Sequence, residues 1–530
     1  MTSQASIRPY LSQAYLLGLL LMAVGLTLSP FLMGMSQFWL VIVWLVDAFA
    51  PPFNGVGGIK TKLSLFLHNK VAVLLALFYL MHIIGLLWTS DFQYAMRDLR
   101  VKLPILVLPF ILSSMEPLDR KRFNFVMLVY VLSVFVATLF SLSTYFKHDY
   151  EDVREISHFI SHIRFCLNIV FCMAIIGYYL FVRKSPWWGK AIQIVLLFWF
   201  AYQIFIFETL SGYVVLAAVA VVSGVYAFLQ WKKSMAWHIA VAVIALVFMG
   251  LATVIVIREV KPLLKVETVD FSTLEKKTAL GNDYWHDTIY NPVEDGKFVG
   301  LYYCKKEMQE AWSQRSVLPF DGTTRNGESL EATLARYLTS KGLRKDAQGV
   351  LALTDEDIQN IEQGVANYNN WRHPGLQARL SSTLFEYNLY KRFNNPNGGS
   401  LSQRIEFTRA SFHIIGQHPW FGVGTGDVPQ AFSQAYDEIQ SPLKEEFRFR
   451  AHNQYLAIAV AFGLVGLAFF LFVLLYPWFA SRKNHTYLYM VFLTIMLLSM
   501  FPEDTLETQA GASLFAFFEA FLLFVAPPRQ

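Results

Sequence analysis

Charged residues are scarce in this sequence. Asp, Glu, Lys and Arg together make up 16% of its 530 residues, whereas about 25% is usual in soluble domains. Hydrophobic residues reach 55%, and the mean hydropathy is +0.39. This scarcity excludes an ordinary soluble globular protein, and a net charge of only +5 gives no reason to expect a nucleic-acid partner. The composition indicates a polytopic membrane protein.

Cysteine is almost absent too. The three cysteines, Cys166, Cys172 and Cys304, are too few for a disulfide framework. The sequence also lacks the Cys/His spacing of a zinc site and the EF-hand pattern, so we predict no structural metal. No convincing small-residue cleavage site follows the apolar run 16–28, which we interpret as a first membrane helix rather than a removed signal peptide.

Long apolar runs, in contrast, follow one another along the chain. A run of roughly 18–25 apolar residues can cross a bilayer, and the sequence predicts about twelve spans in an all-α polytopic membrane protein. They are 11–28, 32–50, 69–88, 101–114, 122–146, 163–182, 188–206, 209–229, 236–257, 452–478, 485–501 and 508–526. The fourth span is short and contains Pro104 and Pro109, so we expect it to be broken or tilted.

The loops between these runs alternate in charge. Every second loop is basic, and positively charged loops stay on the cytoplasmic side of the membrane. The basic residues are Lys60, Lys62, Arg120, Lys121, Arg122, Arg183, Lys184, Lys190, Lys232, Lys233, Arg482 and Lys483. This pattern predicts that both termini are cytoplasmic and that the long segment before the tenth span lies outside.

That long segment, 258–450, is polar and too long for a structureless loop. We predict spans one to nine in 1–257, an extracytoplasmic loop domain in 258–450, and spans ten to twelve in 451–530. The loop domain is expected to be mostly helical and to include a Gly-rich motif at 419–427. Within it, "GVGTGD" (422–427) follows no βαβ unit, so we interpret it as a structural turn rather than a nucleotide site.

Several cations on the predicted outer side have no role in topology. They are Arg97, Arg100, Lys102, Arg154, Arg164, Arg404, Arg409, Arg448 and Arg450. Either these side chains reach from the membrane to the interface, or several of them converge on an anionic ligand such as a pyrophosphate, which guanidinium groups bind bidentately. Arg164 enters the sixth span, where a buried charge is costly, and it therefore needs a partner or a ligand.

His452 opens the tenth span in "FRFRAHNQYL" (447–456), beside Arg448 and Arg450. A histidine at this place is either an interfacial polar residue or a general base, because a neutral imidazole accepts a proton from a hydroxyl group. Glu503 and Asp504, in "PEDTLE" (502–507), are predicted to face the same side of the membrane. They either orient His452 or an acceptor hydroxyl group, or lie in a solvated loop.

Two further stretches carry a family resemblance. "RIEFTRASFHIIGQHPWFGVGTGDV" (404–428) and "AHNQYLAIAVAFGLVGLAFF" (451–470) resemble the signature region of the O-antigen ligase and polymerase superfamily of bacterial membrane glycosyltransferases. The shared pattern is an arginine in an amphipathic segment, a proline before a G-x-G turn, and His-Asn-x-x-Leu at the start of a helix. The number of spans and the large outside loop before that helix are similar as well.

The resemblance implies a GT-C-like fold in the bacterial inner membrane and an inverting transfer that needs neither metal nor cofactor. The donor would be a glycan on undecaprenyl pyrophosphate, held in membrane lipid, and the acceptor a hydroxyl group such as that of lipid A-core. By motif match, Arg404 and His452 take the catalytic positions, His452 as general base. The expected pyrophosphate or glycan ligands are Arg97, Arg100, Arg154, Arg164, Arg448 and Arg450, and the expected orienting residues are Asn453, Glu503 and Asp504.

One position departs from the family. Its members have a cation near the start of the eighth span, where this chain has Leu210, and we expect Arg164 or Arg154 to substitute. Three reactions stay open: ligation, polymerisation, and transfer to protein hydroxyl groups. The rival from another class is a flippase for the same lipid-linked glycan. A flippase should carry charges along a mid-membrane path, whereas the cations without a role in topology gather on the predicted outer side.

Overall fold

The computed structural model describes residues 7–50, 58–147, 153–183, 185–207, 209–230, 258, 261, 265–373, 375–480 and 486–527. Packing divides the chain into two units. The first unit contains Met1–Lys233, Phe407–Ser441 and Arg448–Gln530, and the second contains Ser234–Glu406 and Pro442–Phe447. The Gly-rich motif thus packs with the first unit, although we predicted it as part of the loop domain 258–450. On which side of the membrane either unit lies stays a prediction.

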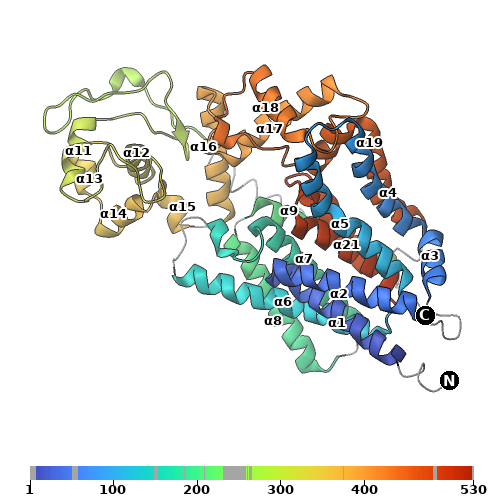
Figure 1. The fold of residues 1–530 in the computed structure, drawn as a ribbon. Helices are drawn as coiled ribbons and strands as arrows, with labels where there is room; N and C mark the ends of the chain where they lie inside the picture. The colour runs from blue at the N-terminus through green and yellow to red at the C-terminus, as the bar shows by residue number, and fades with distance from the viewer. Residues whose placement is uncertain are drawn as a thin grey trace. The chain divides into compact units, whose positions relative to one another are not determined.

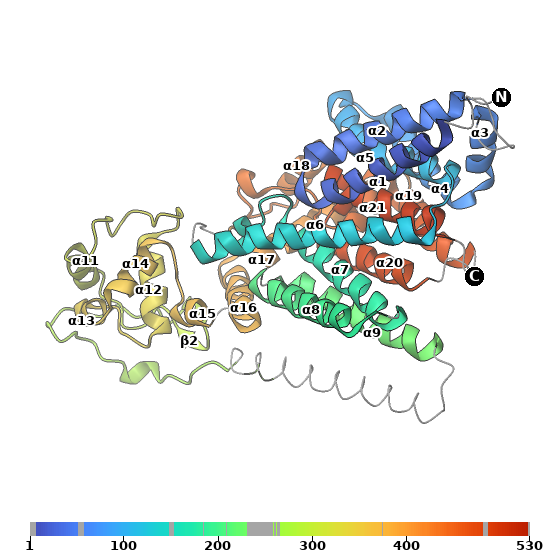
Figure 2. The ribbon, with the colours of Figure 1, turned by 90° about the horizontal axis from the view of Figure 1, so that it is seen from below.

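All regular elements among the described residues of the first unit are helices. Its elements are α1 (Ile7–Leu28), α2 (Pro30–Phe49), α3 (Ile59–His68), α4 (Lys70–Ile84), η1 (Gly85–Trp88), α5 (Phe92–Ser114), α6 (Arg120–Lys147), η2 (Val153–Ile156), α7 (His162–Val182), α8 (Trp187–Phe207), α9 (Leu210–Gln230), the end of α17 (Ser400–Gln417), α18 (Val428–Glu438), α19 (Gln454–Ala480), α20 (Tyr487–Ser499), η6 (Thr505–Glu507), α21 (Gln509–Ala520) and η7 (Phe521–Val525). Figure 2 shows α8 and α9 beside α7, against which both pack.

Eight helices among the described residues are long and apolar enough to cross a membrane. They are Arg8–Leu28, Pro30–Phe49, Lys70–Trp88, Arg120–Lys147, His162–Val182, Trp187–Phe207, Leu210–Phe228 and Gln454–Ala480; Tyr487–Ser499 and Gln509–Val525 are shorter apolar helices. An all-α polytopic fold is therefore supported, whereas the count of twelve spans stays a prediction. The predicted span 236–257 lies outside the described residues.

Helix α5 contains the predicted fourth span, 101–114. The helix begins where it does because the Asp91 carboxylate accepts a hydrogen bond from the Tyr94 N–H (2.9 Å). It continues through Pro104 and Pro109 to its end at Ser114, so the span is not broken, and its tilt in the membrane stays a prediction. Helix α5 packs against α4 and α21 (Figure 1), which brings residues far apart in the sequence onto its buried face.

Helix α19 is interrupted at Gly463, whose φ of +66° lies in the left-handed region. The segment 419–424 lies against this break and replaces the lost helical hydrogen bonds. Three of the bonds run from Val423 N to Val460 O, from Gly424 N to Ala461 O, and from Leu464 N to Pro419 O, at 3.0, 2.9 and 2.8 Å. A Cβ at Gly463 would lie 2.3 Å from the Trp420 carbonyl carbon, so a side chain does not fit there.

Asp427 joins the end of the Gly-rich motif to the turn before α5. Its carboxylate accepts hydrogen bonds from the backbone N–H groups of Ser90 (2.9 Å) and Asp91 (2.8 Å). Burial alone would raise the pKa of Asp427, but these hydrogen bonds hold the pKa below its usual value. Together with the break in α19, this contact gives the motif the structural role that we predicted for it.

The second unit combines short helices with long loops and has its own core. Its elements are η3 (Phe271–Thr273), β1 (Val293–Glu294), β2 (Lys297–Phe298), α11 (Lys305–Ser313), α12 (Leu330–Ser340), α13 (Ala347–Leu351), α14 (Asp355–Glu362), α15 (Tyr368–Arg372), α16 (Leu376–Phe393), the start of α17, and η4 (Glu445–Phe447). The two strands pair antiparallel, with Val293 opposite Phe298. Trp312, Leu334 and Ile361 belong to a buried cluster contributed by α11, α12 and α14.

Candidate active site at the start of helix α19

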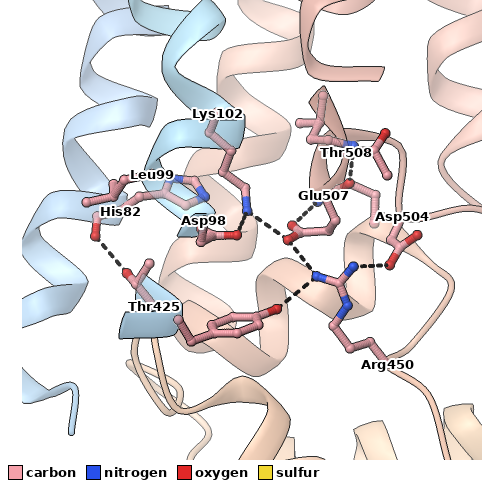
Figure 3. A network of polar contacts seen from close by, with 12 residues as sticks. His82, Asp98, Leu99, Lys102, Thr425, Arg450, Asp504, Glu507 and Thr508 are labelled. Carbon is pink, nitrogen blue, oxygen red and sulfur yellow. Dashed lines mark hydrogen bonds and ion pairs between the residues drawn. The ribbon is translucent and has the colours of Figure 1, made fainter. Parts of the chain in front are cut away.

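Arg450 lies just before α19 and contacts three side chains from distant parts of the first unit (Figure 3). Its Nη1 donates a hydrogen bond to the Tyr94 hydroxyl oxygen of α5 (3.0 Å) and lies 3.2 Å from Glu507 Oε2. Its Nη2 lies 3.4 Å from Asp504 Oδ2. Because these partners belong to α5 and to the turn that precedes α21, they fix the guanidinium group from several directions.

The network continues into α5 through Lys102 (Figure 3). Tyr94, Asp98 and Lys102 follow one another at i, i+4 spacing and therefore share one face of the helix. The Lys102 side chain is only 2% exposed, and its Nζ donates to Asp98 Oδ1 and to Glu507 Oε2, the latter at 2.8 Å. Glu507 therefore lies between two cations, Lys102 and Arg450.

Glu507 is the carboxylate at the centre of the network. Burial alone would raise its pKa, but Lys102 and Arg450 lower it from 4.5 to about 2. Gln454 Nε2 donates to the second carboxylate oxygen (3.2 Å), so both oxygens have partners. Burial alone would likewise lower the pKa of Arg450, but Glu507 and then Tyr94 raise it above its usual value. Glu507 and Arg450 are thus both charged at neutral pH.

His452 lies between Arg450 and α19 in an unusual backbone conformation. Its φ of +44° lies in the left-handed region, which residues other than glycine seldom adopt. Its ring centroid lies 5.5 Å from that of Phe407, and the side chain is 36% exposed. Nδ1 lies 3.9 Å from Asp504 Oδ1, which is beyond hydrogen-bond distance. Such conformations concentrate at functional sites, where the surrounding structure holds them in place.

Arg164 reaches the same place from α7. Its Nη2 lies 3.5 Å from Glu503 Oε2, and both side chains are largely buried. Its Nε is buried and has no hydrogen-bond partner among the described residues. Glu503 is the chain neighbour of Asp504, which lies against Arg450 and His452. Two adjacent carboxylates thus gather two guanidinium groups and one imidazole.

A small cavity lies beside the network and has a volume of about 20 Å³, room for a single water molecule. Its polar lining residues are His82, Tyr94, Asp98, Lys102, Thr425, Arg450 and Glu507. His82 Nε2 is buried without a hydrogen-bond partner among the described residues, and such a water molecule can supply one. The cavity is too small for a pyrophosphate.

Three side chains of the cluster also offer atoms that bind divalent cations. The donor atoms of His452, Glu503 and Asp504 lie within 4.8 Å of one another. Both carboxylates already lie against guanidinium groups, those of Arg164 and Arg450, so a metal ion would meet two fixed positive charges. The absence of a metal from the reaction stays a prediction.

Three predicted ligands lie apart from this cluster. Arg448 Nη1 donates to Asp437 Oδ1 (2.7 Å), and its guanidinium group lies over the Tyr436 ring at 5.7 Å from the ring centroid. Arg97 and Arg100 are exposed on α5, on a different face of the helix from the network residues. The structure does not place these three arginines with Arg164 and Arg450, and their roles as ligands stay predictions.

Three other residues that we predicted for the site are a helix cap, a residue of the second unit, and a residue whose side chain the structure does not describe. Asn453 caps α19, because its Oδ1 accepts a hydrogen bond from the Leu456 N–H (3.0 Å). Arg404 is half-buried on α17 and belongs to the second unit, whereas His452 belongs to the first. The side chain of Arg154 lies outside the described part of the chain. The roles predicted for all three stay predictions.

Sequence analysis missed Tyr94, Asp98 and Glu507. A signal for Asp98 was present, because an acid four residues before Lys102 on a helix is a natural partner for a lysine without a role in topology. Glu507 lies in the acidic stretch "PEDTLE", but no spacing within that stretch distinguishes it from Glu503. Its role depends on the packing of α5 against α21, which the sequence does not show.

Residues 350–471 match a family model described as O-antigen ligase. The matched segment includes α17, α18, the Gly-rich motif, Arg450 and His452, and so contains the stretches that carry the resemblance. No curated protein matches the chain.

Proposed function

We propose, from the chain's membership of the O-antigen ligase superfamily, that it transfers a glycan from undecaprenyl pyrophosphate to a hydroxyl group of lipid A-core. The family match confirms the predicted superfamily. Together with the apolar helices, the match indicates a multi-pass bacterial membrane glycosyltransferase of the ligase or polymerase type. The donor, the acceptor, inversion at the anomeric carbon and independence from metal are our proposal.

The observation that carries the proposal is the convergence of Arg164, Arg450 and His452 on the adjacent carboxylates Glu503 and Asp504. A transfer from a pyrophosphate needs cations near the phosphates as negative charge builds on the leaving group, and a base near the incoming hydroxyl group. Fixed charges of this kind are commonly the largest catalytic contribution. The cluster supplies both kinds of group from two separate parts of the first unit, α7 and the segment just before α19.

We assign pyrophosphate binding to Arg164 and Arg450. Each guanidinium group has five N–H donors, and the carboxylate contacts use only some of them. The contacts hold each group in a defined orientation, which lowers the entropy cost of binding a phosphate. The buried Nε of Arg164, which has no partner among the described residues, supports this assignment for Arg164 in particular.

In the proposed reaction, His452 Nε2 accepts the proton of the acceptor hydroxyl group. The hydroxyl oxygen then forms a bond to the anomeric carbon of the glycan, on the face opposite the leaving group. The bond from that carbon to the phosphate oxygen breaks, and its electron pair leaves with undecaprenyl pyrophosphate. Asp504, 3.9 Å from His452 Nδ1, stabilises the imidazolium and orients the ring once the substrate tightens the site.

The membrane placement belongs to the same proposal. We place the cluster at the outer face of the bacterial inner membrane, both termini in the cytoplasm and the large loop in the periplasm, because basic loops stay inside. A polyprenyl tail then lies in the hydrocarbon region while its pyrophosphate lies at the interface, at the depth where α19 begins. For Arg404 we propose a catalytic role from its position in the family motif alone.

The test is the exchange of His452 for alanine. His452→Ala is expected to lower the rate of glycan transfer 10²–10⁴-fold, the usual contribution of a positioned base. The purified full-length protein, a lipid-linked glycan and lipid A-core provide the assay. His413→Ala is the matched control, because His413 is also accessible in the first unit, where it pairs with Glu438. Full activity of His452→Ala would remove the base from the proposal.

A second experiment separates ligase from polymerase. Deletion of the coding sequence from the host is followed by examination of its surface glycans. Full-length polymer that is no longer attached to lipid A-core supports the proposed ligation. Attachment of single repeats supports polymerisation instead, and loss of glycan from proteins alone supports protein O-glycosylation. Surface glycans identical to those of the parent strain would overturn the proposal.

A further inference from the structure

The second unit contains a cleft of about 520 Å³ at the start of α11. Its walls come from two segments, 282–285 and 303–306, that pair with one another. Backbone hydrogen bonds run in both directions between Trp285 and Tyr303, at 2.8 Å and 3.0 Å. The cleft is open rather than enclosed. The lining residues that matter here are Asn282, Asp283, Trp285, Tyr303, Lys305 and Lys306.

The indole ring of Trp285 is not part of the core of its unit. Trp285 is 59% exposed, whereas Trp312 in the same unit is fully buried in the cluster of α11, α12 and α14. The Tyr303 ring meets the Trp285 ring edge-on, at an interplanar angle of 87° and a centroid distance of 6.0 Å. The exposed face of the indole is therefore available to a ligand at the cleft.

Polar groups at the cleft are held by neighbours of opposite charge or by hydrogen bonds. Asn282 Nδ2 donates to Glu307 Oε1 (2.7 Å), and Asp283 Oδ1 lies 2.7 Å from Lys277 Nζ. Lys305 Nζ lies between Asp321 (3.0 Å) and Glu331 (2.7 Å). The site thus combines one accessible aromatic face with amide, carboxylate and ammonium groups at its rim.

We propose that this cleft binds a hexopyranose unit of the transferred glycan, an inference that rests on the proposed function. A pyranose has an apolar C–H face that stacks on an aromatic ring and a rim of hydroxyl groups that donate and accept hydrogen bonds. The Trp285 ring matches the first feature, and Asn282, Asp283 and Lys306 match the second. An apolar peptide or a membrane surface would cover this mixed polar rim and remove its contact with water without supplying hydrogen bonds in exchange.

Direct binding to the full-length protein in lipid nanodiscs tests the inference. The probe is the free oligosaccharide that mild acid releases from the host's undecaprenyl-linked glycan, followed by saturation-transfer NMR and calorimetry. Trp285→Ala is expected to weaken binding about tenfold, and Trp285→Phe to retain most of it. Tyr290→Ala is the matched control, because Tyr290 is equally exposed in the same unit (60%) and does not line the cleft.

Unchanged binding in Trp285→Ala would overturn the inference, as would an equal loss in Tyr290→Ala. In the transfer assay, Trp285→Ala is expected to raise the KM for the lipid-linked glycan about tenfold and to leave kcat unchanged. A higher KM for the donor supports the inference, because the transferred glycan is part of the donor. A rise confined to the KM for the acceptor would overturn it. His452→Ala is expected to bind the oligosaccharide normally. A fully active His452→Ala would remove the base from the proposed function, and surface glycans that survive deletion of the coding sequence would overturn that function, while direct binding still decides on the cleft.

Discussion

Two lysine–carboxylate ion pairs of nearly equal length lie in different surroundings in the two units. Lys102 Nζ lies 2.8 Å from Glu507 Oε2 in the first unit, and Lys277 Nζ lies 2.7 Å from Asp283 Oδ1 in the second. The side chains of the first pair are 2% and 10% exposed, and those of the second are 60% and 79% exposed. The two pairs therefore differ in burial and hardly at all in distance.

Burial decides how strongly each unit depends on its pair. Water screens the exposed pair and solvates either partner if the other is lost, so pairs of this kind contribute about 0–1 kcal/mol. Loss of one partner from a buried pair leaves an uncompensated charge away from water, at a cost of about 3–5 kcal/mol. Ion-pair distance alone is thus a poor guide to the effect of a substitution in this chain.

The largest effect on stability is expected for Lys102→Met. Asp98 and Glu507 then face one another without the cation between them, and the free energy of unfolding should fall by about 3–5 kcal/mol. Unfolding of the purified protein by SDS in mixed micelles measures the change. The double variant Asp98→Leu/Lys102→Met is the control, because it leaves Glu507 paired with Arg450 and should recover part of the loss. A single variant as stable as the parent would contradict the buried network.

A smaller effect is expected from acid. The pKa of Glu507 lies near 2 in the folded protein and at 4.5 in its ordinary state, so the unfolded chain binds a proton first as the pH falls. The stability that Glu507 contributes is therefore complete above about pH 4.5 and is lost as the pH falls toward 2. Thermal unfolding between pH 6 and pH 3 measures it. Glu507→Gln should lack this pH-dependent part of the stability. The same dependence of the unfolding temperature on pH in the variant and the parent would contradict the assignment to Glu507.

The smallest effect is expected for Lys277→Met in the second unit. The change in the free energy of unfolding should stay below about 1 kcal/mol, because Asp283 keeps its contact with water. The same SDS titration that reports on Lys102→Met measures it. A loss comparable with that of Lys102→Met would show that distance and not burial governs these pairs.

Much of the fold could be predicted from the sequence, because apolar length and loop charge are local properties. Arg164 at the start of α7 and His452 before α19 lie near the helix ends that the hydrophobic runs predict. The continuity of α5 could not be predicted, since Pro104 and Pro109 usually disturb a helix and only its packing between α4 and α21 shows that they are tolerated here.

The candidate site was predicted in part. The requirement that Arg164 have a partner follows from the cost of a buried charge, and the structure supplies Glu503. The contact between Lys102 and Glu507 joins positions 405 residues apart, and no local pattern indicates such a pair. Arg97 and Arg100 lie on a different face of α5 from Lys102, as their spacing along a helix predicts.

The break in α19 makes two distant stretches of the sequence depend on one another. A Cβ at Gly463 would lie 2.3 Å from the Trp420 carbonyl carbon, and one at Gly422 would lie 2.4 Å from the Ala461 carbonyl carbon. Neither glycine can be replaced by a residue with a side chain unless the backbone of the other stretch moves. Substitutions in 419–424 and in 460–465 should therefore occur together among relatives. A chimaera assembled from two relatives will therefore retain its fold only if the crossover points leave both stretches with the same parent.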